Sequence, residues 1–404
     1  MKKSIFALLP LILSCISCDD DNGGKNAREE IILTPAEESI VKSNYSLGAS
    51  LLSELAEDNG NVIISPLSLS MNLSMVAEGA NGPTLNDILG VLVPDAQSID
   101  NLSAFNKKLL KSMPRLDRSA SVKLANSIWI NKQYESHLVD RYATTMLDFY
   151  NAPVNAIDMS GNTMEIINKW CDDNTSGMIP RILNRPLEDE TMMLSANALY
   201  FKGQWKEKFD KHHTRQEYFH NNSGTLSTVK MMNNILEVHY VDNAGFTAVA
   251  LPFGNEAYSL IVVLPKPDSG SLWSSEAGID DIIRLARNET ASRLFDVKLP
   301  RFEISYSREL VSVLADIGLS LPFSMNADFS NILDIEPVKL STVLHAAKIT
   351  VDEDGAEASA VTGSGDIATG PEDAVQFYVD RPFTFILTEQ STGIALFMGQ
   401  VNRL

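Results

Sequence analysis

The segment Asp352-Glu-Asp-Gly-Ala-Glu-Ala-Ser-Ala-Val-Thr-Gly-Ser-Gly-Asp-Ile-Ala-Thr-Gly-Pro-Glu-Asp-Ala374 holds too few large apolar residues to pack as core. In an extended chain alternate residues face opposite sides. One face would then carry only small residues: Ala356, Ala358, Ala360 and Thr362. A surface loop is the plain interpretation of such a segment. The small face also predicts that the segment can slide between existing strands, so that it is exposed in one state and a central strand in another.

Composition limits the partners of the chain. The 404 residues include 44% hydrophobic residues, which is enough for a large core, and the formal net charge is −19. Nucleic acids and heparin-like polyanions bind to concentrated cationic surfaces. We therefore expect no nucleic acid and no heparin-like polyanion among the partners.

The first residues predict a targeting signal. Lys2 and Lys3 precede the apolar run from Ile5 to Leu13, which is too short to span a membrane and suits a signal peptide. The pairs Ser14-Cys15 and Ser17-Cys18 both resemble a bacterial lipobox, whose cysteine is lipidated. We prefer Cys18, because the acidic run 19–21 after it resembles the surface-export signal of lipoproteins in Bacteroidetes-like bacteria.

The domain organisation follows from these segments. Residues 1–18 are predicted as a lipoprotein signal peptide, 19–36 as a flexible acidic tether, and 37–404 as a single domain without repeats or a visible linker. We expect a monomer, lipid-anchored at the bacterial outer membrane or cell surface and exposed to the extracellular space. Of the three cysteines only Cys171 lies in the folded region, which leaves no internal disulfide.

Helical and strand patterns are mixed along the domain. Apolar spacing predicts helices over 40–55 and 66–80, with Gly79 near the second helix end. Strands become frequent later; the clearest are predicted over 127–131, 192–201, 247–252, 258–264, 295–299 and 383–388. Helices concentrated early and strands late indicate an α+β fold.

Enzymatic signatures such as HExxH, a phosphate-binding loop, GxSxG and a dinucleotide fingerprint are missing. A hydrolase could combine Ser65 and His345 with an aspartate. However, Ser65 before Pro66 suits a helix cap, and His345 lies in an alternating segment typical of a buried histidine. His212, His213 and His220 lack a ligand pattern, so we expect neither a metal nor another cofactor.

Ordered motifs from about Val41 to Leu404 resemble the serpin family. They are Asn61-Val-Ile-Ile-Ser-Pro-Leu-Ser-Leu-Ser70, Glu78-Gly-Ala-Asn-Gly82, Leu124-Ala-Asn-Ser-Ile-Trp-Ile130, Ile167-Asn-Lys-Trp170, Asn174-Thr-Ser-Gly-Met-Ile179, Asn197-Ala-Leu-Tyr-Phe-Lys-Gly-Gln-Trp205, Leu299-Pro-Arg-Phe302, Ala327-Asp-Phe-Ser330, Val379-Asp-Arg-Pro-Phe383 and Phe397-Met-Gly-Gln-Val401. The resemblance implies three β-sheets, about nine helices and an exposed reactive-centre loop above a large five-stranded sheet.

The resemblance also implies a mechanism, with roles for particular residues. A serpin is a suicide substrate: a protease cuts the loop, forms an acyl enzyme, and is trapped covalently when the cut loop inserts into the sheet. The implied hinge comprises Glu353, Gly355, Ala356, Glu357, Ala358, Ser359, Ala360, Val361 and Thr362. The implied shutter comprises Ser65, Asn197 and His345, and Trp205 matches the breach, where insertion begins.

The hinge sets the position of the reactive bond. Counted with Glu353 as the first of seventeen residues, the bond joins Thr369 and Gly370, with Ile367 and Ala368 before it. No Lys or Arg occurs between Asp352 and Asp380. We therefore expect serine proteases of elastase-like preference, and also papain-like cysteine proteases, rather than trypsin-like enzymes.

Three loop residues depart from the usual pattern. Ala356 replaces a Thr or Ser but is small, Val361 is bulky but suits a strand, and Asp366 would face inward after deep insertion, where an unpaired carboxylate is costly. Two alternatives stay open at this point. The chain could be a serpin-fold binding protein that does not inhibit, or a surface hydrolase that uses Ser65.

Overall fold

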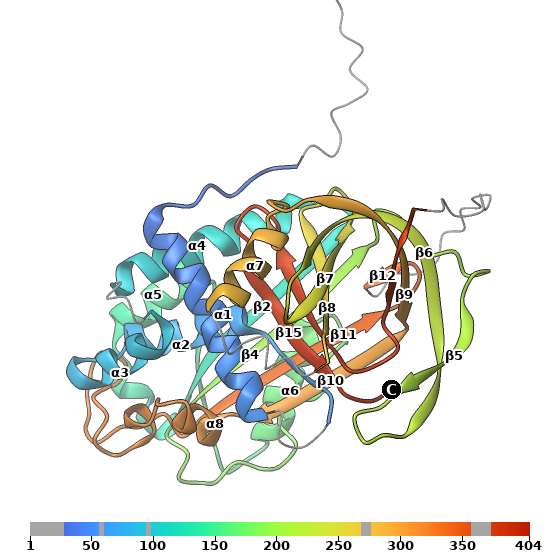
Figure 1. The fold of residues 1–404 in the computed structure, drawn as a ribbon. Helices are drawn as coiled ribbons and strands as arrows, with labels where there is room; N and C mark the ends of the chain where they lie inside the picture. The colour runs from blue at the N-terminus through green and yellow to red at the C-terminus, as the bar shows by residue number, and fades with distance from the viewer. Residues whose placement is uncertain (1–27, 56–59, 94–97, 268–275, 357–372) are drawn as a thin grey trace, which may run out of the picture.

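A computed structural model describes residues 28–55, 60–93, 98–267, 276–356 and 373–404 (Figure 1). The described helices are α1 (Pro35–Leu55), α2 (Pro66–Glu78), α3 (Gly82–Leu92), α4 (Ile99–Leu116), α5 (Asp140–Tyr150), α6 (Thr163–Asn174), α7 (Glu276–Ala286) and α8 (Val311–Asp316), with two 3-10 helices, η2 (Lys132–His137) and η4 (Leu321–Phe323). Within these ranges no helix is long and apolar enough to cross a membrane.

Three sheets share the described strands. The main sheet has the order β10 (Phe302–Glu309), β11 (Thr342–Val351), β12 (Gly355–Ala356), β4 (Met193–Gln204), β2 (Ala120–Asn131) and β3 (Val154–Ile157). The second runs through β1 (Val62–Ile64), β15 (Ala395–Val401), β14 (Phe383–Glu389), β8 (Tyr258–Pro265), β7 (Phe246–Phe253) and β6 (Leu226–Asp242). In the third, β6 also pairs with β5 (Arg215–His220) and β9 (Ser292–Pro300), and β9 pairs with β13 (Val375–Tyr378). The predicted α+β fold with three sheets is confirmed.

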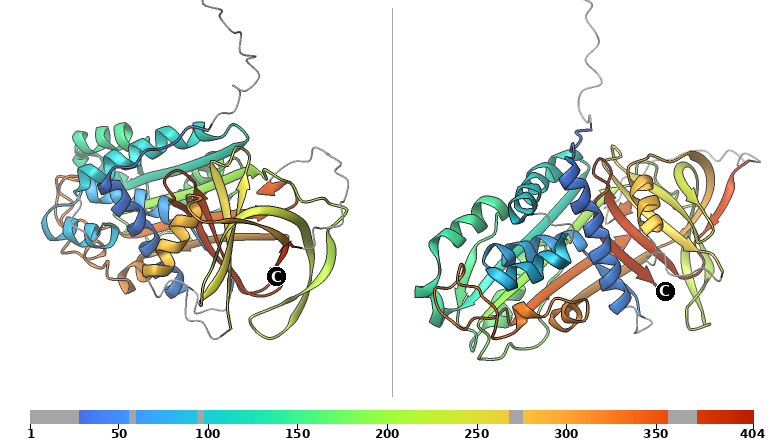
Figure 2. Two further views of the ribbon diagram at one scale, coloured as in Figure 1. Left: turned by 45° about the horizontal axis from the view of Figure 1, so that its top comes forward. Right: turned by 60° about the vertical axis from the view of Figure 1, so that its left-hand side comes forward.

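Both faces of the main sheet are covered over much of its length. Leu199 and Phe201 of β4 face the large core beneath α2, whereas Ala196 and Ala198 face a smaller core that includes Cys171 of α6. Burial on both faces is plain in β4, where ten of the twelve residues are buried. Figure 2 shows most helices gathered at one end of the molecule and the second and third sheets at the other, with α7 packed on the second sheet.

The predicted strands all appear and are longer than expected. The strand β6 was not predicted, because its seventeen residues belong to two sheets and do not keep one alternation. Helix α1 begins at Pro35, before the predicted domain start at 37. The preceding Ile31 is buried, and its N–H donates to Ser391 Oγ at 2.9 Å. The described end of the predicted tether therefore packs on the domain.

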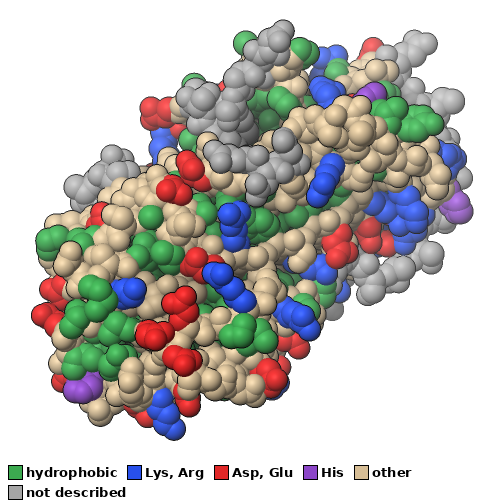
Figure 3. Space-filling view, turned by 90° about the horizontal axis from the view of Figure 1, so that it is seen from below, with side chains coloured by type: hydrophobic (Ala, Val, Ile, Leu, Met, Phe, Trp, Pro, Cys, Tyr) green, Lys and Arg blue, Asp and Glu red, His purple; other side chains and the backbone are tan. Residues whose placement is uncertain are grey.

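Acidic and basic side chains are mixed on the surface. On the face seen in Figure 3, Lys and Arg side chains lie among Asp and Glu side chains.

Candidate functional site

The hinge begins inside the main sheet. Gly355 and Ala356 of β12 lie opposite Gln204 and Gly203 of β4, and Ala356 lies opposite Val351 of β11. Below this point β4 and β11 pair directly and in parallel, from Thr342↔Leu194 to Lys348↔Tyr200. The expectation of a loop exposed from Glu353 onward is wrong for its first four residues, since Glu353, Asp354, Gly355 and Ala356 are all buried. Gly355 and Ala356 pair with the main sheet, and Glu353 and Asp354 lie against cations from other segments.

Gly355 is required by close packing. A Cβ atom on Gly355 would lie 2.0 Å from the carbonyl oxygen of Gly203 and 2.7 Å from the Cα of Gln204, which are main-chain atoms of a central strand. The φ angle of Gly355 is +149°, which L-residues with side chains rarely adopt. Only glycine lets the hinge enter between β4 and β11.

Glu353 is held by a cation from another strand. Arg301 Nη2 lies 2.5 Å from Glu353 Oε2, a contact close enough for an ion pair although it lacks the alignment of a hydrogen bond. The Thr214 hydroxyl donates to Glu353 Oε1. Burial acts to raise the pKa of Glu353, but Arg301 and Thr214 outweigh it, so the pKa is lowered and the buried carboxylate stays charged.

Asp354 is held by two lysines. Lys208 Nζ lies 3.1 Å from Asp354 Oδ1, and Lys211 Nζ lies 2.6 Å from Oδ2. Burial acts to raise the pKa of Asp354, and hydrogen bonds from Lys211 and Lys208 outweigh it, so the pKa is lowered. Sequence patterns could not identify these partners, since 146 and 143 residues separate Lys208 and Lys211 from Asp354.

Trp205, which the resemblance assigns to the breach, packs beside the start of the hinge. Its ring is buried and stacks on Phe253, with centroids 4.3 Å apart and an interplanar angle of 9°. The indole Nε1–H donates to the carbonyl oxygen of Asp352 at 2.8 Å, and the backbone N–H of Trp205 donates to the carbonyl oxygen of Asp354 at 3.0 Å. The hinge backbone is therefore anchored on both sides of Glu353.

The three predicted shutter residues come together beneath the paired part of β4 and β11. The backbone N–H of Ser65 donates to His345 Nε2 at 3.1 Å, so the ring proton is on Nδ1 and donates to Asn197 Oδ1 at 2.6 Å. The Ser68 hydroxyl donates to the same oxygen, and Asn197 Nδ2 donates to the carbonyl oxygen of Leu344. The network joins α2 to both strands.

This geometry gives Ser65 and His345 structural roles. Ser65 Oγ accepts the N–H of Ser68 at 3.1 Å, which is the predicted helix cap. Both ring nitrogens of His345 are hydrogen-bonded, one to the Ser65 N–H and one to Asn197. Ser65 and His345 are completely buried. Burial lowers the pKa of His345 from 6.5 to about 4, so the ring is neutral at pH 7. A serine that caps a helix and a histidine that bonds to main chain and amide do not form a nucleophile and base pair.

The predicted absence of a metal stays an expectation. Among the residues that the structure describes, no three His, Cys, Asp or Glu side chains are placed to hold a metal ion. Of the three histidines considered above, His212 and His220 are exposed.

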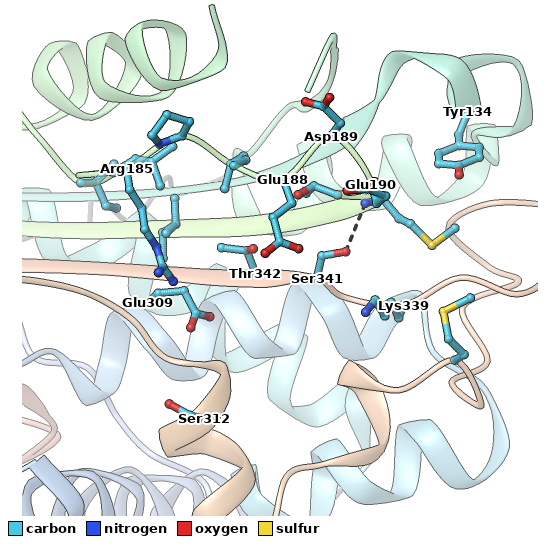
Figure 4. A pocket seen from close by; sticks show the side chains of 18 of the residues that line it. Tyr134, Arg185, Glu188, Asp189, Glu190, Glu309, Ser312, Lys339, Ser341 and Thr342 are labelled. Carbon is cyan, nitrogen blue, oxygen red and sulfur yellow. Dashed lines mark hydrogen bonds between the residues drawn. The ribbon is translucent and has the colours of Figure 1, made fainter. Parts of the chain in front are cut away.

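A broad pocket of about 1480 Å³ lies at the other end of β4 and β11, where both strands begin (Figure 4). Acidic and basic side chains line it, among them Arg185, Glu188, Glu309 and Lys339. Ser341 accepts the N–H of Met192 at 3.1 Å and joins the two strands at this edge.

Several predicted site residues lie outside the described residues. They are the hinge residues from Glu357 to Thr362, Asp366, Ile367, Ala368, and the bond Thr369–Gly370, as well as Cys18.

Comparisons with known proteins agree with this architecture. The profile of one family, described as Serpin (serine protease inhibitor), matches residues 42–404. A serpin-like protein of Thermococcus kodakarensis is 30% identical, and the match covers 92% of this chain and 87% of that protein. Serpin-ZX of Arabidopsis thaliana is also 30% identical, over 85% of this chain and 92% of its own length.

Solved structures show the same fold. The native state of Tengpin, a thermophilic serpin, superposes with a TM-score of 0.83 at 27% identity and covers 93% of this chain and 96% of its own. The native stressed conformation of AtSerpin1 from Arabidopsis has a TM-score of 0.78 at 27% identity and covers 92% and 99%. The three-sheet fold, the buried shutter network and these matches together show that the chain belongs to the serpin family.

Proposed function

We propose that this chain is a suicide-substrate inhibitor of serine proteases, and of papain-like cysteine proteases, that works by loop insertion. Membership in a family of protease inhibitors supports an inhibitory function. The observation that carries the mechanism is β12: Gly355 and Ala356 are already paired between β4 and β11 as the first two residues of a new strand. After cleavage, each further residue would extend this strand and gain backbone hydrogen bonds on both sides.

The described strands suit such an extension. On the existing register, Ala358, Ala360 and Thr362 would follow Ala356 on the inner face, where small side chains avoid overpacking. His345 and Asn197 would have to separate as the strand passes between them, since their bond joins β11 to β4. Insertion must be faster than hydrolysis of the acyl enzyme. The strength of this hydrogen-bond network would therefore affect the fraction of protease that is trapped.

We propose a position for Asp366 by extending the same register. Ten residues beyond Ala356, it would lie opposite Met193 of β4 and Ser341 at the start of β11. Ser341 and Lys339 line the pocket of Figure 4. Because Met193 is fully buried in the large core, the inserted carboxylate would still be partly desolvated, with Ser341 as its polar neighbour.

The reactive bond and the target class remain proposals from the sequence. We propose cleavage between Thr369 and Gly370, after Ile367 and Ala368, and the absence of Lys and Arg from the loop supports elastase-like or papain-like targets. The partner is then the target protease, held in a covalent complex.

We further propose that the protein is a monomer anchored through lipidated Cys18 at the bacterial cell surface. The signal-like residues 1–18 and the acidic run after them support this location. A net charge of −19 supports the absence of nucleic-acid and heparin-like partners.

The test is incubation with a panel of proteases that includes neutrophil elastase and papain, followed by a denaturing gel. The expected result is a covalent complex with at least one serine protease, and a higher thermal midpoint after loop cleavage. Loop cleavage with neither a complex nor a gain in stability would favour the binding-protein alternative. Hydrolysis of a model ester that is lost in Ser65→Ala would favour the hydrolase.

A further inference from the structure

We propose that the side chain of Ser341 forms the last clasp that strand insertion must open, and that this clasp limits the rate at which insertion is completed. The clasp is the hydrogen bond from the N–H of Met192 to Ser341 Oγ, which joins the starts of β4 and β11. The inference rests on the proposed function, since it assigns a residue to a late step of the same insertion.

The register places the clasp at the far end of the path between the two strands. The hinge enters at Ala356, opposite Gly203 of β4. The direct ladder between β4 and β11 lies below this point, and its most distant pair is Thr342↔Leu194. Gly203 and Leu194 are nine residues apart along β4, which is about 30 Å of extended strand. Separation of the strands that starts at the hinge therefore reaches Ser341 last.

Ser341 closes this end of the sheet with two hydrogen bonds. Its N–H donates to the carbonyl oxygen of Met193 at 2.8 Å, and its Oγ accepts the N–H of Met192 at 3.1 Å. Met192 is also held from its other side, because its carbonyl oxygen accepts the N–H of Asn131 of β2 at 2.8 Å. The clasp therefore ties the start of β11 to a part of β4 that β2 already holds in place.

Beyond the clasp the two chain segments diverge. The N–H of Leu340 donates to the carbonyl oxygen of Pro322 in η4 at 3.0 Å, so the chain before β11 is held away from β4. The pocket of about 1480 Å³ lies between the diverging segments, and Ser341 stands on its wall (Figure 4). A strand that passes the clasp would emerge into this pocket. Among the described residues, the clasp is thus the final contact between β4 and β11 on that path.

One hydrogen bond at this position is enough to affect a kinetic competition. The net contribution of a hydrogen bond between uncharged groups corresponds to about a two- to tenfold change in an equilibrium or a rate. Ser341 and Met192 are both partly exposed, so water can replace a lost partner and no buried group is left unpaired. Removal of the Ser341 hydroxyl should therefore lower the barrier to completing insertion without unfolding the native protein.

The experiment compares the full chain with Ser341→Ala and with Ser341→Thr, which keeps the hydroxyl group. Ser307→Ala is the matched control: Ser307 lines the same pocket, but its hydroxyl donates to the carbonyl oxygen of Ile182 at 2.8 Å and does not join β4 to β11. Each protein is mixed with neutrophil elastase, or with the panel protease that the wild type traps. The rate constant for loss of protease activity is measured at saturating inhibitor, and the thermal midpoints of the native and loop-cleaved forms are measured in parallel.

For Ser341→Ala we expect the limiting rate constant to rise about two- to tenfold. The native midpoint should fall, whereas the midpoint of the cleaved form should stay at the wild-type value, because the clasp is already open in that form. Ser307→Ala should lower both midpoints and leave the rate constant unchanged, and Ser341→Thr should behave as the wild type. An unchanged rate constant for Ser341→Ala, in a protein whose wild type traps protease, overturns this inference and leaves the proposed function intact. A wild type that neither traps protease nor gains stability on cleavage refutes both.

Discussion

Replacement of Gly355 by alanine should convert the proposed inhibitor into a substrate with little effect on the native fold. The added methyl carbon would lie 2.0 Å from the carbonyl oxygen of Gly203, which cannot move without disturbing the ladder between β4 and β2. The hinge must then leave the sheet. It loses two backbone hydrogen bonds with Asp352, at 2.9 and 3.3 Å, the pairing with Gln204 and Gly203 of β4, and the burial of Ala356, together about 3–5 kcal/mol.

In the native state, the conformational entropy of the released residues offsets most of this loss of stability. Two released residues regain about 2–4 kcal/mol of backbone conformational freedom, so the two contributions nearly cancel. The native thermal midpoint should therefore stay close to that of the wild type. The inserted state has no such compensation, because every later residue can enter only after residue 355 has passed the main chain of β4.

The assay is a denaturing gel of protease mixtures, together with thermal unfolding before and after loop cleavage. Gly355→Ala should be cut in the loop without forming a covalent complex and without gaining stability. Gly90→Ala is the control, because a Cβ atom there meets no atom within 4 Å, and it should trap protease normally. Covalent complex formation by Gly355→Ala at the wild-type molar ratio would refute the idea that β12 is the start of insertion.

Other predictions concern the buried polar groups. His345→Gln should lower the free energy of unfolding at pH 7 by about 2 kcal/mol in urea titrations, because it disrupts the bonds to Ser65 and Asn197. The pKa of His345 falls from 6.5 to about 4 on folding, so the unfolded chain binds the proton more readily; wild-type stability should decrease by about 3 kcal/mol as the pH falls from 6.5 to 4. His345→Gln should remove that part of the pH dependence, and an unchanged slope would contradict the assignment of a neutral buried ring. Arg301→Gln should cost about 2 kcal/mol in thermal unfolding, since Glu353 is left buried without its cation, and Arg301→Gln with Glu353→Gln should recover part of the loss. Equal midpoints for the single variant and the wild type would show that this ion pair contributes nothing.

Local signals predicted part of the site correctly. Ser65 before Pro66 indicated a helix cap, and alternation around His345 indicated a buried strand residue; both were confirmed. Such features depend on residues a few positions apart, and the chain itself determines their geometry. The alternating small residues of the loop likewise predicted a segment compatible with a sheet, although the sequence did not show that Gly355 and Ala356 already occupy it.

The partners of the hinge could not be predicted in the same way. Arg301, Lys208 and Lys211 are ordinary surface-type residues in sequence, and only the approach of β4 and β10 to the end of β11 brings them to Glu353 and Asp354. By itself the sequence determined the α+β class, the helix cap, the small-residue face of the loop and the resemblance to serpins, because these follow from local spacing. The tertiary structure alone decided where the hinge enters and which cations hold it, because a buried carboxylate is stable only beside charges that distant segments supply.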